Sequence, residues 1–205
     1  MTVIARNGNE VIFSSGLSSW FEKNEVHFRI AGTRKSKLGD YRPPWNHMPA
    51  RITINSGLNP YEFLITLIHE MAHHTTWKEW KEESWRGRIR PEPHGKEWKR
   101  HFQEMMTPFL NSEFFPDDIL EILRLYVQNP TASSKTNLQL GRVLKNYDGH
   151  DNTELLENLP TDALFHLPDG RIFKKKEKLR KRYRCLNMEN RRTYLFHPLV
   201  KIIRD

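Results

Sequence analysis

The stretch that decides the fold runs from Asn59 to His73 and reads NPYEFLITLIHEMAH. Asn59 is a favourable helix N-cap, Pro60 suits the first helical position, and Glu62 completes a capping-box signal. We therefore predict a helix that begins at Pro60 and ends near Trp77. Its apolar side is expected to be buried and comprises Phe63, Leu64, Leu67, Ile68 and Met71.

Within this helix, His69, Glu70 and His73 form an HExxH motif. Residues four apart on a helix project from one face, about 5 to 6 Å apart at their bases, so both imidazoles can bind one zinc ion. Glu70 projects about a quarter turn away and can reach a zinc-bound water as general base. The sequence thus predicts a centre with a single Zn²⁺ that supplies both metal binding and a base.

A catalytic zinc ion normally takes three protein ligands, so a third must come from elsewhere in the chain. We favour His94, which follows a loop and stands at the entry to a predicted helix. Glu92, His74 and His101 remain alternatives, with His101 also a candidate for a supporting group. Cys185 is the only cysteine, which excludes an intrachain disulfide and a zinc cluster built on cysteines.

Alternating apolar residues predict strands before the helix, and apolar periodicity predicts two further helices after it. We expect a domain over residues 1–128, a linker over 129–137 that is rich in Ser, Thr and Asn, and a small basic antiparallel β module over 138–205. Strands are predicted at 25–30, 50–55, 163–167, 171–174, 182–186 and 193–196, with another possible near 38–41, and helices at 94–106 and 116–127.

The composition contains 33 Lys and Arg against 25 Asp and Glu, a formal net charge of +8. The run from Arg171 to Arg184 holds nine Lys or Arg and one acid, Glu177, so it carries a charge equal to that of the whole chain. Such a basic segment suits salt-sensitive contacts with phosphates, and we predict DNA or another nucleic acid as a partner.

No apolar run long enough for a membrane span and no secretory signal is present, so a cytoplasmic location without membrane contact is expected.

Taken together, His69-Glu70-Met71-Ala72-His73 and the later His94-Gly95-Lys96-Glu97-Trp98 resemble the SprT-like metalloprotease family, which includes the Spartan proteases. The resemblance extends to the strand segments upstream and covers roughly residues 26–106. It implies zinc ligands at His69, His73 and His94, a catalytic Glu70, and an α+β, zincin-like fold in which a small antiparallel sheet packs on the active-site helix. Spartan-type members act on proteins bound or crosslinked to DNA.

One departure from the family pattern lies near the C-terminus. SprT-like proteins commonly carry a zinc ribbon with paired cysteines there, whereas this chain has the single Cys185. We therefore expect a ribbon-like β module without metal. It would be held by apolar packing of Leu164, Phe165, Ile172, Phe173, Tyr183, Leu195 and Phe196.

The predicted function is that of a zinc-dependent metalloendopeptidase that cleaves a protein substrate associated with nucleic acid, with a zinc-bound water activated by Glu70. Tyr41, Arg88 and Arg90 are candidates for stabilising the oxyanion. We also expect an extended substrate to pair with an exposed edge at Ile52 to Asn55. The alternative is a nucleic-acid-binding or transcription-associated protein in which zinc is structural and Glu70 has no catalytic role.

Overall fold

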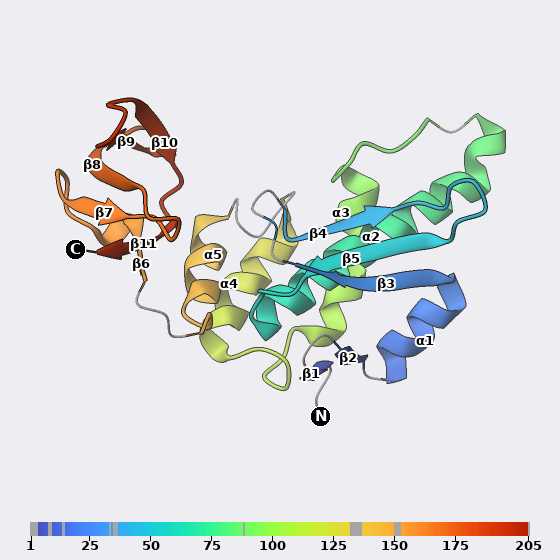
Figure 1. Cartoon of the computed structure of the whole chain (residues 1–205). Helices are drawn as coiled ribbons and strands as arrows, with labels where there is room; N and C mark the ends of the chain where they lie inside the picture. Colours follow the sequence, from blue (N-terminus) through green and yellow to red (C-terminus); the bar gives the residue numbers. More distant parts are fainter. Residues whose placement is uncertain are drawn as a thin grey trace. The chain divides into compact units, whose positions relative to one another are not determined.

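The computed structural model describes residues 4–7, 10–13, 15–32, 34, 37–87, 89–131, 137–149 and 153–204. The chain forms two compact units, Met1–Asp148 and Gly149–Asp205. Figure 1 shows helices and short strands in the first unit and strands in the second. The predicted α+β class is confirmed.

The first unit contains five α-helices among the described residues, together with two short sheets. Its elements are β1 (Ile4–Asn7), β2 (Glu10–Phe13), α1 (Ser15–Asn24), β3 (Val26–Ala31), β4 (Gly39–Arg42), β5 (Ala50–Asn55), α2 (Pro60–Glu83), η1 (Ser84–Arg86), α3 (Lys96–Met106), η2 (Thr107–Phe109), α4 (Asp117–Gln128) and α5 (Leu138–Lys145). α2 extends six residues beyond the predicted end near Trp77, and β3, β4 and β5 lie where strands were predicted.

The sheet that supports α2 has the strand order β3-β5-β4. β3 runs parallel to β5, and β4 runs antiparallel to it, so the sheet is mixed, whereas we predicted an antiparallel one. Because β5 pairs on both sides, its residues Ile52 to Asn55 offer no free edge to a substrate, and that expectation was wrong. The free edge near α2 belongs to β4.

α2 is the central helix of the first unit, and its N-terminus is capped as predicted. The Asn59 side chain accepts a hydrogen bond from the backbone N–H of Glu62, at 2.9 Å. Apolar side chains of α2 enter two separate clusters, one with α3, α4 and α5 and one with α1 and the three-stranded sheet. The first cluster takes Leu64, Ile65, Ile68 and Ala72 of α2, and the second takes Phe63, Leu67 and Met71.

The boundary between the units falls after Asp148, later than the predicted linker at 129–137. α5 was not predicted, and it belongs to the first unit because Leu140 and Leu144 are buried in the cluster with α3 and α4. The Asn59 amide reinforces this packing by donating to the Leu144 carbonyl at 2.8 Å and to Asp148 Oδ1 at 2.9 Å. Residues 132–136 lie outside the described residues.

The second unit is a six-stranded sheet of order β10-β9-β8-β7-β11-β6, with antiparallel neighbours. Its strands are β6 (Glu154–Leu155), β7 (Leu164–His166), β8 (Ile172–Lys178), β9 (Tyr183–Asn187), β10 (Thr193–Phe196) and β11 (Lys201–Arg204), with η4 at Leu156–Asn158. Phe165, Phe173 and the thiol of Cys185 are buried in its core. Leu164, Ile172 and Leu195 are exposed instead, because alternate residues of a strand point to opposite faces.

Among the described residues, no helix combines the length and apolar character needed to cross a bilayer.

We expect replacement of Asn59 by Ala to lower the free energy of unfolding by about 2 to 3 kcal/mol, because the change removes an N-cap and leaves buried polar groups without partners. Urea unfolding followed by circular dichroism measures this. Asn137, which caps α5 by accepting from Leu140 N and is less buried, provides a matched control with an expected cost of about 1 kcal/mol. An equal loss of unfolding free energy in the two variants would contradict a stabilising role for the hydrogen bonds from Asn59 to Leu144 and Asp148.

Candidate metal centre

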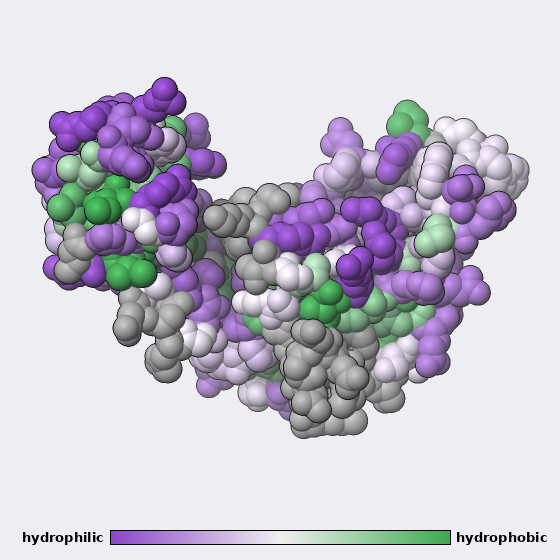
Figure 2. All heavy atoms as spheres, in the orientation of Figure 1, coloured by the Kyte–Doolittle hydropathy of each residue, from purple (hydrophilic) through white to green (hydrophobic). Residues whose placement is uncertain are grey.

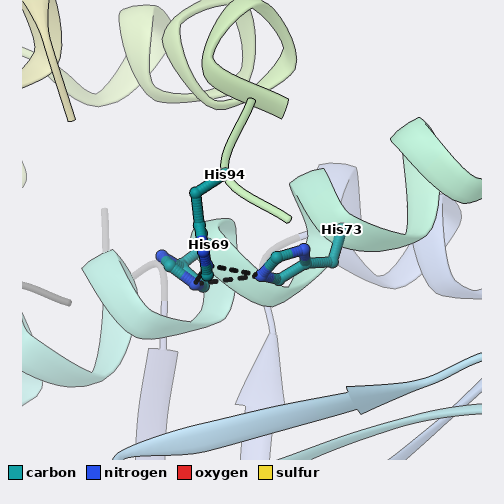
Figure 3. A group of neighbouring side chains, drawn as sticks. All are labelled: His69, His73 and His94. Atoms are coloured by element: carbon teal, nitrogen blue, oxygen red, sulfur yellow. Dashed lines mark hydrogen bonds between the residues drawn. The ribbon is translucent and has the colours of Figure 1, made fainter. Parts of the chain in front are cut away.

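His69, His73 and His94 converge at one point of the first unit (Figure 3). Their Nε2 atoms lie 3.1 Å apart for His69 and His73, 3.0 Å for His73 and His94, and 3.1 Å for His69 and His94. Two of these side chains come from successive turns of α2, and the third descends from the segment before α3. The structure thus brings together the three residues that the sequence favoured as ligands.

The position of His94 depends on a tight turn before α3. The Gly95 N–H donates to the Glu92 carbonyl at 2.9 Å, and His94 itself has a left-handed backbone with φ of 60°. A Cβ on Gly95 would lie 3.0 Å from that carbonyl oxygen, so a side chain there would open the turn. Gly95 is therefore needed for the close approach of its backbone to Glu92.

Trp98 supports the three imidazoles from one side. Its ring centroid lies 4.6 Å from that of His69, 5.5 Å from His73 and 4.7 Å from His94. Its indole N–H also donates to the His69 carbonyl at 3.3 Å. Because Trp98 is only 1% exposed, it forms a rigid wall that limits the rotation of the imidazoles.

The electrostatics of the site keep the three imidazoles neutral. Burial, together with the proximity of the other two histidines, lowers the pKa of His69 to about 2. Burial and His94 lower the pKa of His73 to about 3, and burial lowers the pKa of His94. Neutral imidazole is the form that binds a metal ion.

Hydrogen bonding alone cannot satisfy these three nitrogens. Each Nε2 of a neutral imidazole carries either a proton or a lone pair, so among three mutual neighbours at least two have the same character and repel each other. A cation removes this conflict by accepting all three lone pairs. The spacing also fits, since tetrahedral zinc with Zn–N bonds of 2.0 to 2.1 Å places its ligand nitrogens about 3.3 Å apart. The residues therefore fit a metal ion.

Glu70 lies on α2 beside the histidines, where it is 6% exposed. Burial raises its pKa to about 8, and the negative charge of Asp40 contributes in the same direction. A hydrogen bond from the Tyr41 backbone amide and the charges of Lys37 and Arg34 act the opposite way. A carboxyl group with its pKa close to neutrality is suited to both accepting and releasing a proton.

The metal centre opens into a cleft of about 800 Å³ between β4 and the segment that follows α2. Glu70 and all three histidines line it, and so do Tyr41 and Arg90, two of the residues suggested as oxyanion donors. The third, Arg88, lies outside the described residues. Three tryptophans also line the cleft, namely Trp77, Trp80 and Trp98. Trp85, which follows α2, is not among the lining residues, and 75% of its surface is exposed.

The alternative ligands do not join the cluster. His74 Nδ1 lies 3.2 Å from the hydroxyl of Tyr41, and His101 Nε2 lies 2.6 Å from a carboxylate oxygen of Glu79. Glu92 lines the cleft without belonging to the group of residues that could hold a metal ion.

Asp40, whose charge raises the pKa of Glu70, was not among the site residues predicted from the sequence. The available signal was an acidic residue within the possible strand near 38–41.

The chain was compared with protein families, with curated proteins and with solved structures. A family model described as SprT-like family matches residues 7–117, which is more than half of the 205-residue chain. Searches of curated proteins and of solved structures found no match. The matched region contains the three histidines, Glu70 and the cleft between β4 and α2.

Replacing any one of His69, His73 and His94 by Ala should weaken Zn²⁺ binding more than about 100-fold, since loss of even a supporting group outside the ligands costs 10- to 100-fold. Competition with a chromogenic chelator measures the affinity. His27, which is exposed on β3, is the control, and its replacement should leave the affinity unchanged. Retention of wild-type affinity by the His94→Ala variant would exclude His94 as a ligand.

Proposed function

The chain belongs to the SprT-like family, and on this basis we propose that it is a zinc-dependent metalloendopeptidase. The observation that carries the proposal is the placement of a buried carboxyl group, Glu70, and three neutral imidazoles on the wall of one open cleft. His69, His73 and His94 would hold the zinc ion. Three protein ligands leave a position for water or substrate, as catalytic zinc sites require.

When bound, zinc supplies a Lewis acid that polarises a substrate carbonyl and lowers the pKa of a water molecule. Glu70 would accept a proton from the attacking water on its carboxylate as the water oxygen bonds to the peptide carbonyl carbon. The same carboxyl group would then donate that proton to the leaving amine nitrogen as the C–N bond breaks.

The cleft provides the groups that would orient a polypeptide substrate. β4 lies along one wall and has an unpaired strand edge within the described sheet, to which an extended chain can add. Trp77 and Trp80 offer apolar surface for substrate side chains. Tyr41 and Arg90 are the lining residues that can donate hydrogen bonds to a developing oxyanion.

A Glu70→Gln variant should lower kcat for cleavage at least about 100-fold, because the amide keeps the size of the side chain but cannot accept the proton. Zinc-loaded full-length chain and variant are incubated with a denatured protein and with a DNA-bound protein, and fragments are quantified. Zinc content, measured in parallel, should be equal in both. Equal cleavage by the two proteins would refute catalysis by Glu70, and no cleavage by either would favour the structural role of zinc.

Association of the substrate with nucleic acid is a further part of the proposal, supported by the charge distribution of the second unit. Of the nine basic residues from Arg171 to Arg184, Lys175 is 3% exposed and donates to the carbonyls of Leu156, Glu157 and Leu159. Four more pair with acids, namely Arg171 with Asp169, Lys174 and Lys176 with Asp162, and Arg184 with Glu177. Acidic side chains thus offset part of the charge of these five residues, although Asp162 is shared by two lysines.

The other four are Lys178, Arg180, Lys181 and Arg182, which surround the turn between β8 and β9 and which we call the basic turn. All four are exposed, and none has an ion-pair partner in the part of the chain that the structure describes. The turn is closed by the Leu179 N–H donating to the Arg182 carbonyl at 2.7 Å. Hydrophilic residues cover much of this part of the second unit, where β8 to β10 lie (Figure 2). Phosphates are the polyanionic groups that such a turn suits.

Replacing all four residues of the basic turn by Ala should reduce affinity for a DNA oligonucleotide at least about 10-fold and flatten the dependence of affinity on salt. Fluorescence anisotropy at several salt concentrations measures both. The matched control replaces Arg171, Lys174, Lys176 and Arg184, which removes the same charge from residues that are already paired. Equal losses in the two variants, or no DNA binding by the wild type, would contradict the assignment of this surface.

A further inference from the structure

β4 passes so close to α2 that Gly39 touches the side chain of Glu70. A Cβ placed on Gly39 would lie 2.9 Å from Glu70 Oε1 and 3.1 Å from its Cγ. The same Cβ would lie 2.8 Å from Thr66 Cγ2, one turn earlier on α2. These separations are shorter than carbon atoms and carboxylate oxygens normally approach, so even the methyl group of alanine does not fit here.

Thr66 cannot move aside to make room. Its side chain is buried, and its hydroxyl donates to the Glu62 carbonyl at 2.7 Å. A β-branched residue within a helix also has few rotamers available. A side chain at position 39 must therefore displace either the strand or the carboxylate of Glu70.

The strand is held firmly through the residue next to Gly39. Asp40 forms ion pairs with Arg34, Lys37 at 3.3 Å and Arg42 at 3.4 Å. These pairs, opposed by burial, lower the pKa of Asp40, so it stays ionised at neutral pH. The backbone of β4 is also paired with β5 in register, with Gly39 opposite Ile54.

Arg34 and Lys37, which precede β4, are held by the buried side chain of Asn55. Its amide donates to the carbonyls of Arg34 at 3.2 Å and Lys37 at 2.6 Å, and its oxygen accepts from Arg34 Nε at 2.7 Å. Because β4 is anchored through Asp40 and through the contacts of Asn55, the Glu70 carboxylate at the end of a flexible side chain is the group that moves most easily.

We propose that Gly39 is a positioning residue for the general base. Because residue 39 has no side chain, the Glu70 carboxylate can occupy the position from which it would accept a proton at the metal centre. This inference rests on the proposed function for the role of Glu70. A Cβ at position 39 would rotate the carboxylate away from the place where it accepts a proton. A misplacement of about 1 Å in a reacting group is enough to reduce a catalytic rate about 100-fold.

The first test compares cleavage kinetics of the zinc-loaded full-length chain with those of three variants. Gly39→Ala should lower kcat about 100-fold while KM and zinc affinity change less than about threefold, because only the base is displaced. In the double variant Gly39→Ala/Thr66→Ser, the serine removes only the contact with Thr66 Cγ2. This variant should be more stable than Gly39→Ala, but its kcat should remain as low. Gly32→Ala is the control, since a Cβ there meets no atom within 4 Å.

Recovery of kcat in the double variant would overturn the proposal, because it would show that the contact with Thr66 and the fit of the strand are what matter. An unchanged kcat in Gly39→Ala would overturn it equally.

The second test does not depend on activity and separates this inference from the proposed function. Crystal structures of the wild type and of Gly39→Ala should show the Glu70 carboxylate displaced by about 1 Å or more, with β4 in place. A carboxylate in its original position, or a strand that lifts while Glu70 stays, would overturn the proposal even if the chain cleaves proteins. A displaced carboxylate would support it even if the wild type cleaves none of the substrates tried.

Discussion

Burial of α2 on two sides is the constraint on which the rest of the first unit depends. At 3.6 residues per turn, Phe63, Leu67 and Met71 form one apolar stripe, and Leu64, Ile65, Ile68 and Ala72 form a second stripe beside it. The remaining arc of the helix carries Thr66, His69, Glu70 and His73. The two clusters fix the rotation of α2, and its polar arc must then face the cleft.

The other parts of the site are built around this arc. α3 packs against α2 through Trp98 and Phe102, and its start places His94 opposite His69 and His73. From the other side, β4 lies against Thr66 and Glu70, held by the ion pairs of Asp40. α3 thus positions His94 from one side of α2, and β4 contacts Glu70 from the other.

Much of this arrangement is visible in the sequence because it depends on local signals. The cap at Asn59, the i, i+4 spacing of His69 and His73, and the β-branched run of β5 predicted their elements closely. The order of the three strands, the burial of α5 and the contact of Gly39 with Glu70 could not be predicted, because they arise from pairing and packing between distant segments. For the run of basic residues from Arg171 to Arg184, the sequence could not predict which side chains are paired or buried. The ion pairs and the burial of Lys175 depend on how the strands of the second unit align.

The measurement that tests the account most directly is a crystal structure of the zinc-loaded chain with anomalous diffraction at the zinc absorption edge. We expect one zinc ion bonded to Nε2 of His69, His73 and His94 at about 2.0 to 2.1 Å, with a water molecule as the fourth ligand near the Glu70 carboxylate. A zinc ion closed by a fourth protein ligand such as Glu92, or bound away from these histidines, would contradict it.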